Sequence, residues 1–213
     1  MPDLVVTVPM DFWLDWLDEG DLPGDQPGGA FDAYDFSVGR GGRPSIAPGE
    51  RVYVVAHGRV RGYAPLVEAV KLDDGRWSLV RKGGAVAVTT DETIRGFRGY
   101  RERWWKREAE RPFPDWQTEG VVLPCDTCDK RRPIVGFQLS GGRWAWCWPC
   151  LEDDLRERRA AGIPIAEWAL KAEERGKAMV AAEEQRIAAQ ELLVSRDVKH
   201  DIHEGAKPVG MGR

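Results

Sequence analysis

The four cysteines of the chain form two closely spaced pairs, and they are the residues best suited to chemistry in this sequence. Each pair has the spacing C-x2-C, and eighteen residues separate the two pairs. One tight turn can present both thiolates of such a pair to one ion, and four thiolates complete the tetrahedral coordination that Zn²⁺ prefers. The spacing therefore predicts a structural zinc site without an open coordination position, with four ligands: Cys125, Cys128, Cys147 and Cys150.

Two strands and a helix are expected to position these cysteines. Residues 132–139 and 143–146 have the composition of β-strands, and the Ser-Gly-Gly sequence at 140–142 is typical of a hairpin turn. Residues 151–161 read as a helix with acidic residues in its first turn. A cysteine pair, a hairpin and a helix that begins at the second pair resemble the treble-clef and zinc-ribbon group of zinc fingers. We expect the metal to stabilise residues 121–162 and to have no catalytic role.

The start of the chain bears on an alternative for the cysteines, namely two disulfide bonds in an exported protein. A secretory segment needs basic residues before an apolar stretch, whereas this sequence has Asp3 and a short apolar run at residues 4–10. Disulfides are rare in reducing compartments. We therefore expect a cytoplasmic protein with zinc-bound cysteines, and no membrane partner, since no apolar stretch reaches the length of a membrane span.

Basic and aromatic side chains alternate in two stretches of the chain. On the expected strands 51–56 and 59–63, alternation places aliphatic side chains on one face and arginine and tyrosine on the other. A second stretch, residues 95–111, holds seven basic and three acidic residues among aromatic ones. Bases stack on aromatic rings while guanidinium groups hold phosphates, so this composition is typical of binding to RNA or to a single-stranded or flipped base. The candidate nucleic-acid-binding residues are Tyr53, Arg59, Arg61, Tyr63, Arg95, Arg98, Tyr100, Arg101 and Arg103.

The charge distribution supports two interpretations of these arginines. The net charge is only −4, but residues 1–35 hold nine acidic and no basic residues, whereas residues 36–111 hold sixteen basic and nine acidic ones. A basic region favours a polyanionic partner. The alternative is that Trp104 and Trp105 close the fold while the arginines are solvated or pair with the acidic residues 1–35. Both interpretations stay open at this point.

The strand pattern of the first 111 residues indicates a small β-barrel. Strands follow each other at short intervals, and the one helix expected there covers residues 9–19, where Trp and Leu recur at helical spacing. About six strands without intervening helices favour an antiparallel barrel. The expected strands are 4–8, 34–38, 51–56, 59–72, 77–81 and 85–90.

One stretch within this region resembles a known family. Residues 48–62 read Pro-Gly-Glu-Arg-Val-Tyr-Val-Val-Ala-His-Gly-Arg-Val-Arg-Gly, after a strand and a tryptophan-rich helix that ends at Gly20. This pattern resembles the ASCH branch of the PUA-like superfamily over roughly residues 3–105. The resemblance implies a small barrel that binds RNA and, in some members, cleaves it. Those proteins commonly carry Gly-x-Lys-x-x-Glu-x-Arg after the first helix, whereas residues 20–27 lack the lysine, glutamate and arginine, which argues against ribonuclease chemistry.

The chain as a whole is expected to be an α+β protein built from consecutive parts. A PUA-like antiparallel barrel with a short N-terminal helix is followed by a proline-rich linker, the four-cysteine module and a long helix. The helix has a narrow apolar stripe, so it either packs on the cysteine module or pairs with a second copy of the chain. The expected parts are residues 1–111 (barrel), 112–120 (linker), 121–162 (zinc module), 163–196 (long helix) and 197–213 (disordered tail).

Three functions are compatible with these features. The first is a non-catalytic nucleic-acid-binding protein, in which the barrel contacts RNA or an exposed or modified base and the zinc module supports that surface. The second is an adaptor that binds a protein partner through the zinc module and residues 163–196. The third is an ASCH-like ribonuclease. No catalytic residue is predicted, because the sequence offers no paired carboxylates in a setting that shifts their pKa and no free nucleophile beside a base.

Overall fold

The structure is a computed structural model that describes residues 2–19, 33–40, 42–82, 85–138 and 144–204. It divides into two compact units, Met1–Cys150 and Leu151–Arg213, which we describe separately. All four cysteines belong to the first unit. The sequence placed a linker at residues 112–120; in the structure the division between compact units follows the last cysteine instead.

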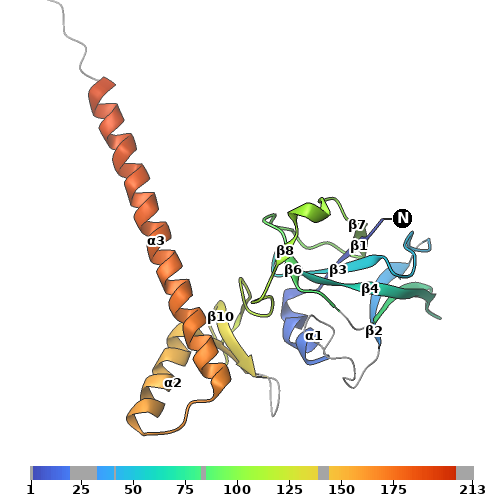
Figure 1. Ribbon diagram of the computed structural model, residues 1–213, viewed down its shortest axis with the longest axis horizontal. Helices are drawn as coiled ribbons and strands as arrows, with labels where there is room; N and C mark the ends of the chain where they lie inside the picture. The colour runs from blue at the N-terminus through green and yellow to red at the C-terminus, as the bar shows by residue number, and fades with distance from the viewer. Residues whose placement is uncertain (1, 20–32, 41, 83–84, 139–143, 205–213) are drawn as a thin grey trace, which may run out of the picture. The chain divides into compact units, whose positions relative to one another are not determined.

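The first unit contains a six-stranded curled sheet that forms a half-barrel (Figure 1). The strand order is β2-β5-β4-β3-β1-β7, and β1 runs parallel to β3 while every other pair is antiparallel. The prediction of an antiparallel sheet is therefore wrong for this pair, because the chain passes through α1 and the edge strand β2 before β3 lies beside β1 in the same direction. The strands are β1 (Leu4–Thr7), β2 (Ala33–Arg40), β3 (Arg51–Ala56), β4 (Arg59–Lys71), β5 (Arg76–Lys82) and β7 (Tyr100–Glu102).

The turn between β3 and β4 confirms the sequence prediction. His57 and Gly58 have φ angles of 49° and 76°, the left-handed values that a two-residue hairpin turn requires at both central positions. Glycine adopts this conformation without steric cost, and histidine is one of the few other residues found there. The long hairpin β3–β4 is thus encoded locally.

The concave side of the sheet holds the main hydrophobic core. Helix α1 (Trp13–Glu19), preceded by the 3-10 turn η1 (Met10–Phe12), places Trp13 and Leu17 against aliphatic residues of β1, β3 and β5. Trp13 is fully buried, so the interpretation of this tryptophan as a core residue is confirmed. The indole Nε1–H of Trp13 donates to the carbonyl oxygen of Gln117 at 3.0 Å, which satisfies its polar atom in the interior.

The opposite side of the sheet is covered as well. Residues 94–105 pack over it and form a second apolar cluster that includes Tyr53, Val55, Ile94 and Trp105. The strands therefore have no solvent-facing side at this point. This second layer explains why β3 is buried almost along its whole length, from Val52 to Ala56.

The four-cysteine module belongs to the same unit as the half-barrel. Its strands β9 (Val122–Pro124), β10 (Arg131–Gln138) and β11 (Trp144–Cys147) form a three-stranded antiparallel sheet. Leu123 and Ile134 belong to the same core cluster as Trp13. A further two-stranded ribbon joins β6 (Val88–Thr89) to β8 (Arg111–Pro112), and the 3-10 turn η2 (Arg107–Ala109) precedes β8. The predicted hairpin turn at 140–142 lies outside the described residues.

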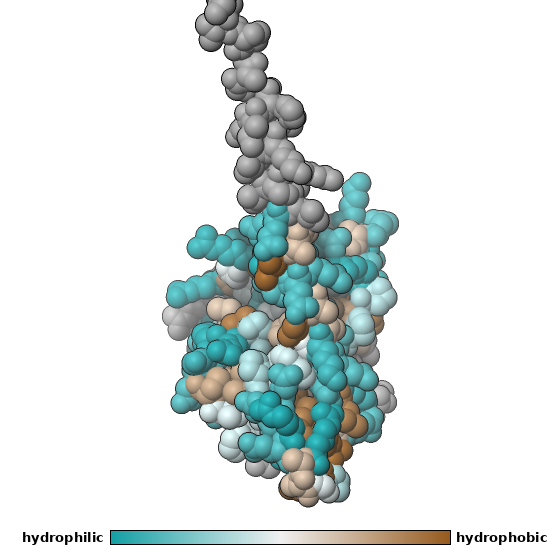
Figure 2. Space-filling view, turned by 90° about the vertical axis from the view of Figure 1, so that its left-hand side faces the viewer, coloured by the Kyte–Doolittle hydropathy of each residue, from teal (hydrophilic) through white to brown (hydrophobic). Residues whose placement is uncertain are grey.

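Two helices make up the second unit. Helix α2 (Trp148–Ala160) begins at the cysteine pair and continues into this unit, and α3 (Glu167–Glu204) follows it. Arg159 of α2 pairs with Glu173 of α3 at 2.5 Å, and the first turns of α3 bury Ala169 and Ala172. Figure 2 shows the face of the molecule that is on the left in Figure 1. Hydrophilic side chains dominate this face, and the apolar ones form separate spots. Every residue from 177 to 191 is exposed.

Helix α3 extends further than the sequence suggested. It reaches Glu204, whereas the prediction ended the helix at residue 196 and placed a disordered tail from 197. Residues 205–213 lie outside the described part of the chain. None of the helices within the described residues is both long and apolar enough to cross a membrane.

Candidate metal centre and basic pocket

The four cysteines lie together as the sequence predicted. Their Sγ atoms are all within 4.8 Å of one another, and those of Cys128 and Cys147 are 3.9 Å apart. Two thiolates on one tetrahedral zinc ion, each about 2.3 Å from it, would lie about 3.8 Å apart. The four sulfur atoms therefore have the spacing of a coordination shell, and they can hold a metal ion.

The first cysteine pair sits in a tight backbone turn. The N–H of Asp129 donates to the carbonyl oxygen of Cys125 at 2.8 Å, and the N–H of Cys125 donates to that of Lys130 at 3.1 Å. Asp129 has a φ of 54°, which reverses the chain directly after Cys128. The turn is tied to β11, because the N–H of Asp126 donates to the carbonyl oxygen of Ala145 at 3.0 Å. These bonds bring the two pairs together.

The environment of the thiols favours a bound cation. Burial raises the pKa of Cys125, but the N–H groups of Cys147, Thr127 and Cys128 outweigh it and lower that pKa to about 6. Burial and the neighbouring thiols raise the pKa of Cys150 instead. Opposite shifts follow when several thiols share one small space, since the first negative charge opposes the next. A cation at the centre removes this conflict.

Arg61 is buried, which corrects the strand-alternation prediction. Its guanidinium is fully buried and donates to the carbonyl oxygens of Ala56, Trp116 and Glu119 at 2.8–3.0 Å. The charge lies 5.4 Å from the ring centroid of Trp13. Burial, followed by the charge of Arg59, lowers the pKa of Arg61 to about 10. Its position predicts a structural role and leaves it inaccessible to a phosphate.

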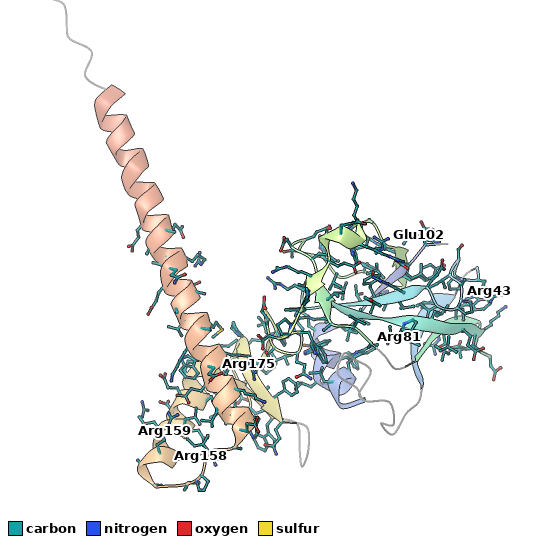
Figure 3. All side chains as sticks on the ribbon, viewed as in Figure 1. Arg43, Arg81, Glu102, Arg158, Arg159 and Arg175 are labelled. Carbon is teal, nitrogen blue, oxygen red and sulfur yellow. The ribbon has the colours of Figure 1, made fainter. Side chains whose placement is uncertain are left out.

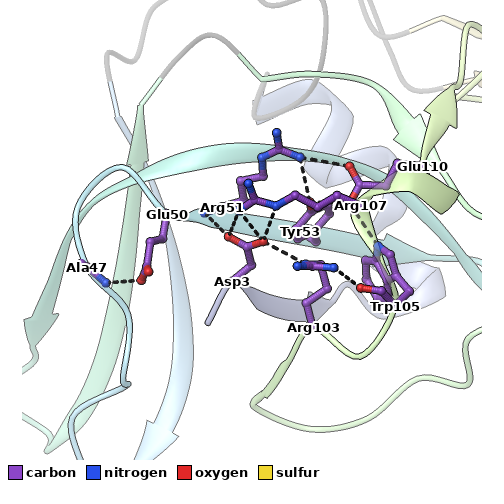
Figure 4. Close-up of polar contacts among 9 residues, drawn as sticks. All are labelled: Asp3, Ala47, Glu50, Arg51, Tyr53, Arg103, Trp105, Arg107 and Glu110. Atoms are coloured by element: carbon purple, nitrogen blue, oxygen red, sulfur yellow. Dashed lines mark hydrogen bonds and ion pairs between the residues drawn. The ribbon is translucent and has the colours of Figure 1, made fainter. Parts of the chain in front are cut away.

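Tyr53 is also fully buried, below the segment that covers the outer side of the sheet. Its hydroxyl donates to a carboxylate oxygen of Glu110 at 2.6 Å, and Arg51 reaches the same carboxylate at 3.0 Å (Figure 4). The indole Nε1–H of Trp105 donates to it at 3.2 Å. The prediction of a solvent-facing Tyr53 is therefore wrong, because residues 94–110 supply both the apolar cover and the acceptor.

Asp3 forms the second half of this polar network. Its carboxylate is buried and accepts hydrogen bonds from the Arg103 Nε at 2.9 Å, the Arg107 Nη2 at 2.9 Å and the backbone N–H of Arg51 at 3.1 Å (Figure 4). Burial raises the pKa of Asp3, and these hydrogen bonds lower it by more, so that it stays below its ordinary value. Arg103 is thus engaged in fixing the covering segment to the start of the chain.

The remaining predicted residues fall into two groups. Arg59 is half-exposed and pairs with Glu119, Tyr63 is half-buried under the guanidinium of Arg51 at 4.1 Å, and Tyr100 packs against the main core. The exposed group consists of Arg95, Arg98 and Arg101.

The three exposed arginines all lie in the covering segment, residues 94–110. The guanidinium of Arg101 lies 4.5 Å from the ring centroid of Phe97. Within the described part of the chain, none of the three forms an ion pair. They are therefore the predicted residues that remain available to a polyanion.

A pocket of about 590 Å³ lies beside these arginines. Its walls come from the end of β1 and the residues after it (7–10), the β3–β4 turn (55–58) and residues of the covering segment between 94 and 99, including Phe97 and Arg98. The hydroxyl of Thr7 donates to the carbonyl oxygen of Phe97, which holds the covering segment to β1. The volume is that of a pocket for a small molecule or a single nucleotide unit.

His57 lines this pocket and is neutral at pH 7. Its Nδ1 accepts a hydrogen bond from the backbone N–H of Val122 at 3.3 Å, which assigns the ring hydrogen to Nε2. Burial, followed by the charges of Arg61 and Arg131, lowers the pKa of His57 to about 4. Nε2 is buried and meets no acceptor at hydrogen-bonding geometry among the described residues, although the Met10 carbonyl is near enough to oppose the pKa shift. His57 therefore contributes a neutral ring to the pocket wall.

Sequence reasoning missed several residues that organise this region. Asp3 entered only as an acidic residue at the start of the chain and Glu110 only as a charge in a segment total, although they hold the polar network together. Arg81 of β5 is likewise buried, 5.3 Å from the ring centroid of Trp16 (Figure 3). Their partners lie far away in the sequence, so no local spacing could reveal them. The dipeptide at 57–58 did signal a turn, and the turn is one wall of the pocket.

Comparison with known proteins finds no family model, no curated protein and no solved structure that matches this chain.

Proposed function

We propose that the protein binds single-stranded nucleic acid, with RNA as the first candidate, through the pocket and the exposed arginines beside it, and that it does so without catalysis. The observation that carries the proposal is the pocket itself, which combines apolar walls, a neutral histidine ring and Arg98 at one place. Arg95 and Arg101 extend the positive charge next to it. This combination suits a base inside the pocket and phosphates along its edge.

The curled sheet and its N-terminal helix are features that a PUA-like domain would have, which supports the resemblance to RNA-binding PUA-like proteins. In that interpretation the sheet would be part of a PUA-like barrel, and the missing lysine, glutamate and arginine at residues 20–27 would separate this chain from ASCH proteins that cleave RNA. The catalytic alternative makes a distinct prediction. RNA incubated with the zinc-loaded protein in a buffer without other divalent metal would be shortened, and Arg98→Ala would abolish the shortening.

We assign the ion at the four cysteines as structural Zn²⁺. Four sulfur ligands at tetrahedral spacing favour zinc, and they leave no open position for a reacting water. The cysteine module contacts the pocket wall in two places. The backbone N–H of Val122 donates to His57, which lines the pocket, and Arg131 forms an ion pair of 2.9 Å with Asp11, the neighbour of the pocket residue Met10. In the proposed function the metal thus supports one wall of the binding site.

Fluorescence anisotropy with labelled RNA, single-stranded DNA and duplex DNA tests the proposal. We expect binding to single strands whose affinity falls steeply as salt rises, since phosphate contacts release counterions. Arg98→Ala should weaken binding severalfold and reduce the slope against log salt by about 1. Arg76→Ala is the matched control, because Arg76 is an exposed arginine that pairs with Asp74 on the β4–β5 turn. Absence of binding to all three nucleic acids would contradict the proposal.

A protein partner for α3 is the second candidate function. The observation that favours it is a set of exposed apolar side chains on a helix whose residues 177–191 pack against nothing in the described chain. Val180 and Ile187 are seven residues apart, the spacing of a helix that pairs with another. We take a second copy of this chain as the partner. The exposed apolar residues of α3 are Trp168, Leu170, Met179, Val180 and Ile187.

Light scattering of the full chain over a range of concentrations tests this second candidate. Self-association through α3 predicts a dimer that Ile187→Glu converts to a monomer, because a charge in a helix seam is costly. Glu184→Lys, an exposed change one turn away, is the control. A monomer at all concentrations would exclude a second copy as the partner.

A further inference from the structure

The outer face of the cysteine module carries two adjacent indole rings. Trp144 and Trp146 are two positions apart on β11, so their side chains leave the same face of the strand. Their ring planes differ by only 22°, and the ring centroids are 6.4 Å apart. Trp144 is 47% exposed. The pair is thus a near-parallel aromatic surface with one ring largely open to solvent.

The strand that carries these rings is fixed from its other face. Ala145 and Cys147 are buried, the first in the main core and the second in the metal cluster. The indoles are therefore not needed to fill the core, and the metal site immobilises the backbone beneath them. A rigid aromatic surface binds with less loss of conformational entropy than a mobile one.

Basic residues lie on the strand next to the two rings. Across the hairpin, Trp146 pairs with Gly136 and Trp144 pairs with Gln138. Three consecutive basic residues, 130–132, precede and begin β10. Alternate side chains of a strand lie about 6.6 Å apart, and the ring centroids are 6.4 Å apart, so the two indoles form one surface along the strand on which bases can stack.

We propose that Trp144 and Trp146 form a second stacking site for a base of the strand bound at the pocket, an inference that rests on the proposed function. Continuity supports it, because the module is fixed to the pocket wall by the Val122 to His57 hydrogen bond and the Arg131–Asp11 ion pair. A strand that leaves the pocket therefore meets the basic start of β10 before the two indoles. Stacking on an indole ring tolerates any base, since every base has a π-face.

The test measures the affinity of the metal-loaded full chain for a labelled uridine oligonucleotide of about 12 nucleotides, within the range that such surfaces occupy. Trp144→Ala should weaken binding about 5- to 100-fold, and Trp144→Tyr should restore most of it, since a ring remains. The control Trp168→Ala removes an exposed indole from α3 and should change affinity less than twofold. Equal zinc content and equal thermal midpoints show that Trp144→Ala leaves the fold intact.

A series of oligonucleotides with one abasic position each identifies the stacked base. One abasic position should weaken binding to the wild-type chain but not to Trp144→Ala, because the partner ring is already missing. Binding that responds to Arg98→Ala and not to Trp144→Ala would overturn the stacking site and leave the proposed function standing. No binding by the wild-type chain would overturn both. A change in self-association without a change in nucleic-acid affinity would also overturn it, by showing that the indoles contact protein.

Discussion

The β3–β4 hairpin and the covering segment 94–110 have similar sequences, but the burial of their side chains differs. Both alternate arginine with aromatic residues, yet Arg61 and Tyr53 of the hairpin are fully buried, whereas Arg98 and Arg101 of the covering segment are exposed. The difference is one of layers. The covering segment lies on one side of the sheet, so its own outer side chains reach solvent and Tyr53 beneath it becomes part of the interior. Arg61 is buried on the other side of the sheet, beside Trp13 of the main core.

The comparison teaches that a basic-aromatic pattern is not by itself a binding surface. In the hairpin the arginine donates to three backbone carbonyls and the tyrosine donates to a carboxylate, so both side chains are held inside the fold. In the covering segment Arg103 and Arg107 are held by Asp3, whereas Arg95, Arg98 and Arg101 form no ion pair within the described residues. Four experiments can break or sharpen this distinction, and they follow in order of decreasing effect.

Removal of a metal ligand should have the largest effect. Cys147→Ser or a strong chelator should unfold residues 121–150, because structural zinc contributes about 10–16 kcal/mol of apparent binding free energy to modules of this kind. The buried hairpin should loosen too, since the carbonyls that hold Arg61 belong to residues just before the module.

Hydrogen exchange of the full chain, read by mass spectrometry, measures both effects. Protection should return when zinc is added to the chelated wild-type chain but not to Cys147→Ser. Unchanged protection in residues 121–150 after complete loss of metal would show that the cluster does not hold the module.

Arg61→Ala should be the next most damaging change. It leaves the carbonyls of Ala56, Trp116 and Glu119 without their donor and opens a cavity beside Trp13, at a cost of about 3 kcal/mol or more in the free energy of unfolding. Urea unfolding followed by tryptophan fluorescence measures it. A stability equal to that of the wild type would mean that the buried network is not formed.

Lowering the pH should destabilise the protein through His57. The pKa of His57 is about 4 in the folded chain and about 6.5 when unfolded, so the unfolded chain takes up the proton first as the pH falls. The contribution is complete above pH 6.5 and is lost between pH 6.5 and pH 4. Because His57 is partly exposed, we expect a loss of about 1–2 kcal/mol.

The measurement compares urea unfolding of the wild type and His57→Asn at pH 7 and pH 5. Asparagine tolerates the positive φ of this position and does not titrate, so the variant isolates the histidine from the carboxylates. The same pH dependence in both proteins would assign the effect to other groups.

Arg101→Ala should have the smallest effect on stability, below about 1 kcal/mol, because it removes one exposed cation–π contact with Phe97. Its effect should appear in nucleic-acid affinity instead, as a modest loss with a shallower salt dependence. The same urea and anisotropy measurements apply. A large loss of stability would show that Arg101 has a structural role like that of Arg61, and it would contradict the distinction between the two regions.

Locally encoded features were predictable from the sequence. The C-x2-C pairs specified the cysteine cluster, since each spacing fits one turn, and the His-Gly dipeptide at 57–58 specified the hairpin turn, since both residues accept left-handed backbone angles. The strands of the long hairpin and the burial of Trp13 followed from the periodicity of the side chains. In each case the determining residues lie within a few positions of one another.

The tertiary structure alone decided which polar residues are available. Alternation along β3 correctly separates two faces, but along β4 the register shift opposite Val54 and Val55 places Val60 with Tyr53 and directs Arg61 to the main core. Alternation also cannot tell that a segment 40 residues later will cover Tyr53, nor that Asp3 and Glu110 will hold that segment there. The parallel pairing of β1 with β3 and the pocket at their ends also depend on this long-range packing. The sequence by itself therefore determined the cysteine cluster and the local elements, whereas burial by distant segments decided which polar side chains stay exposed.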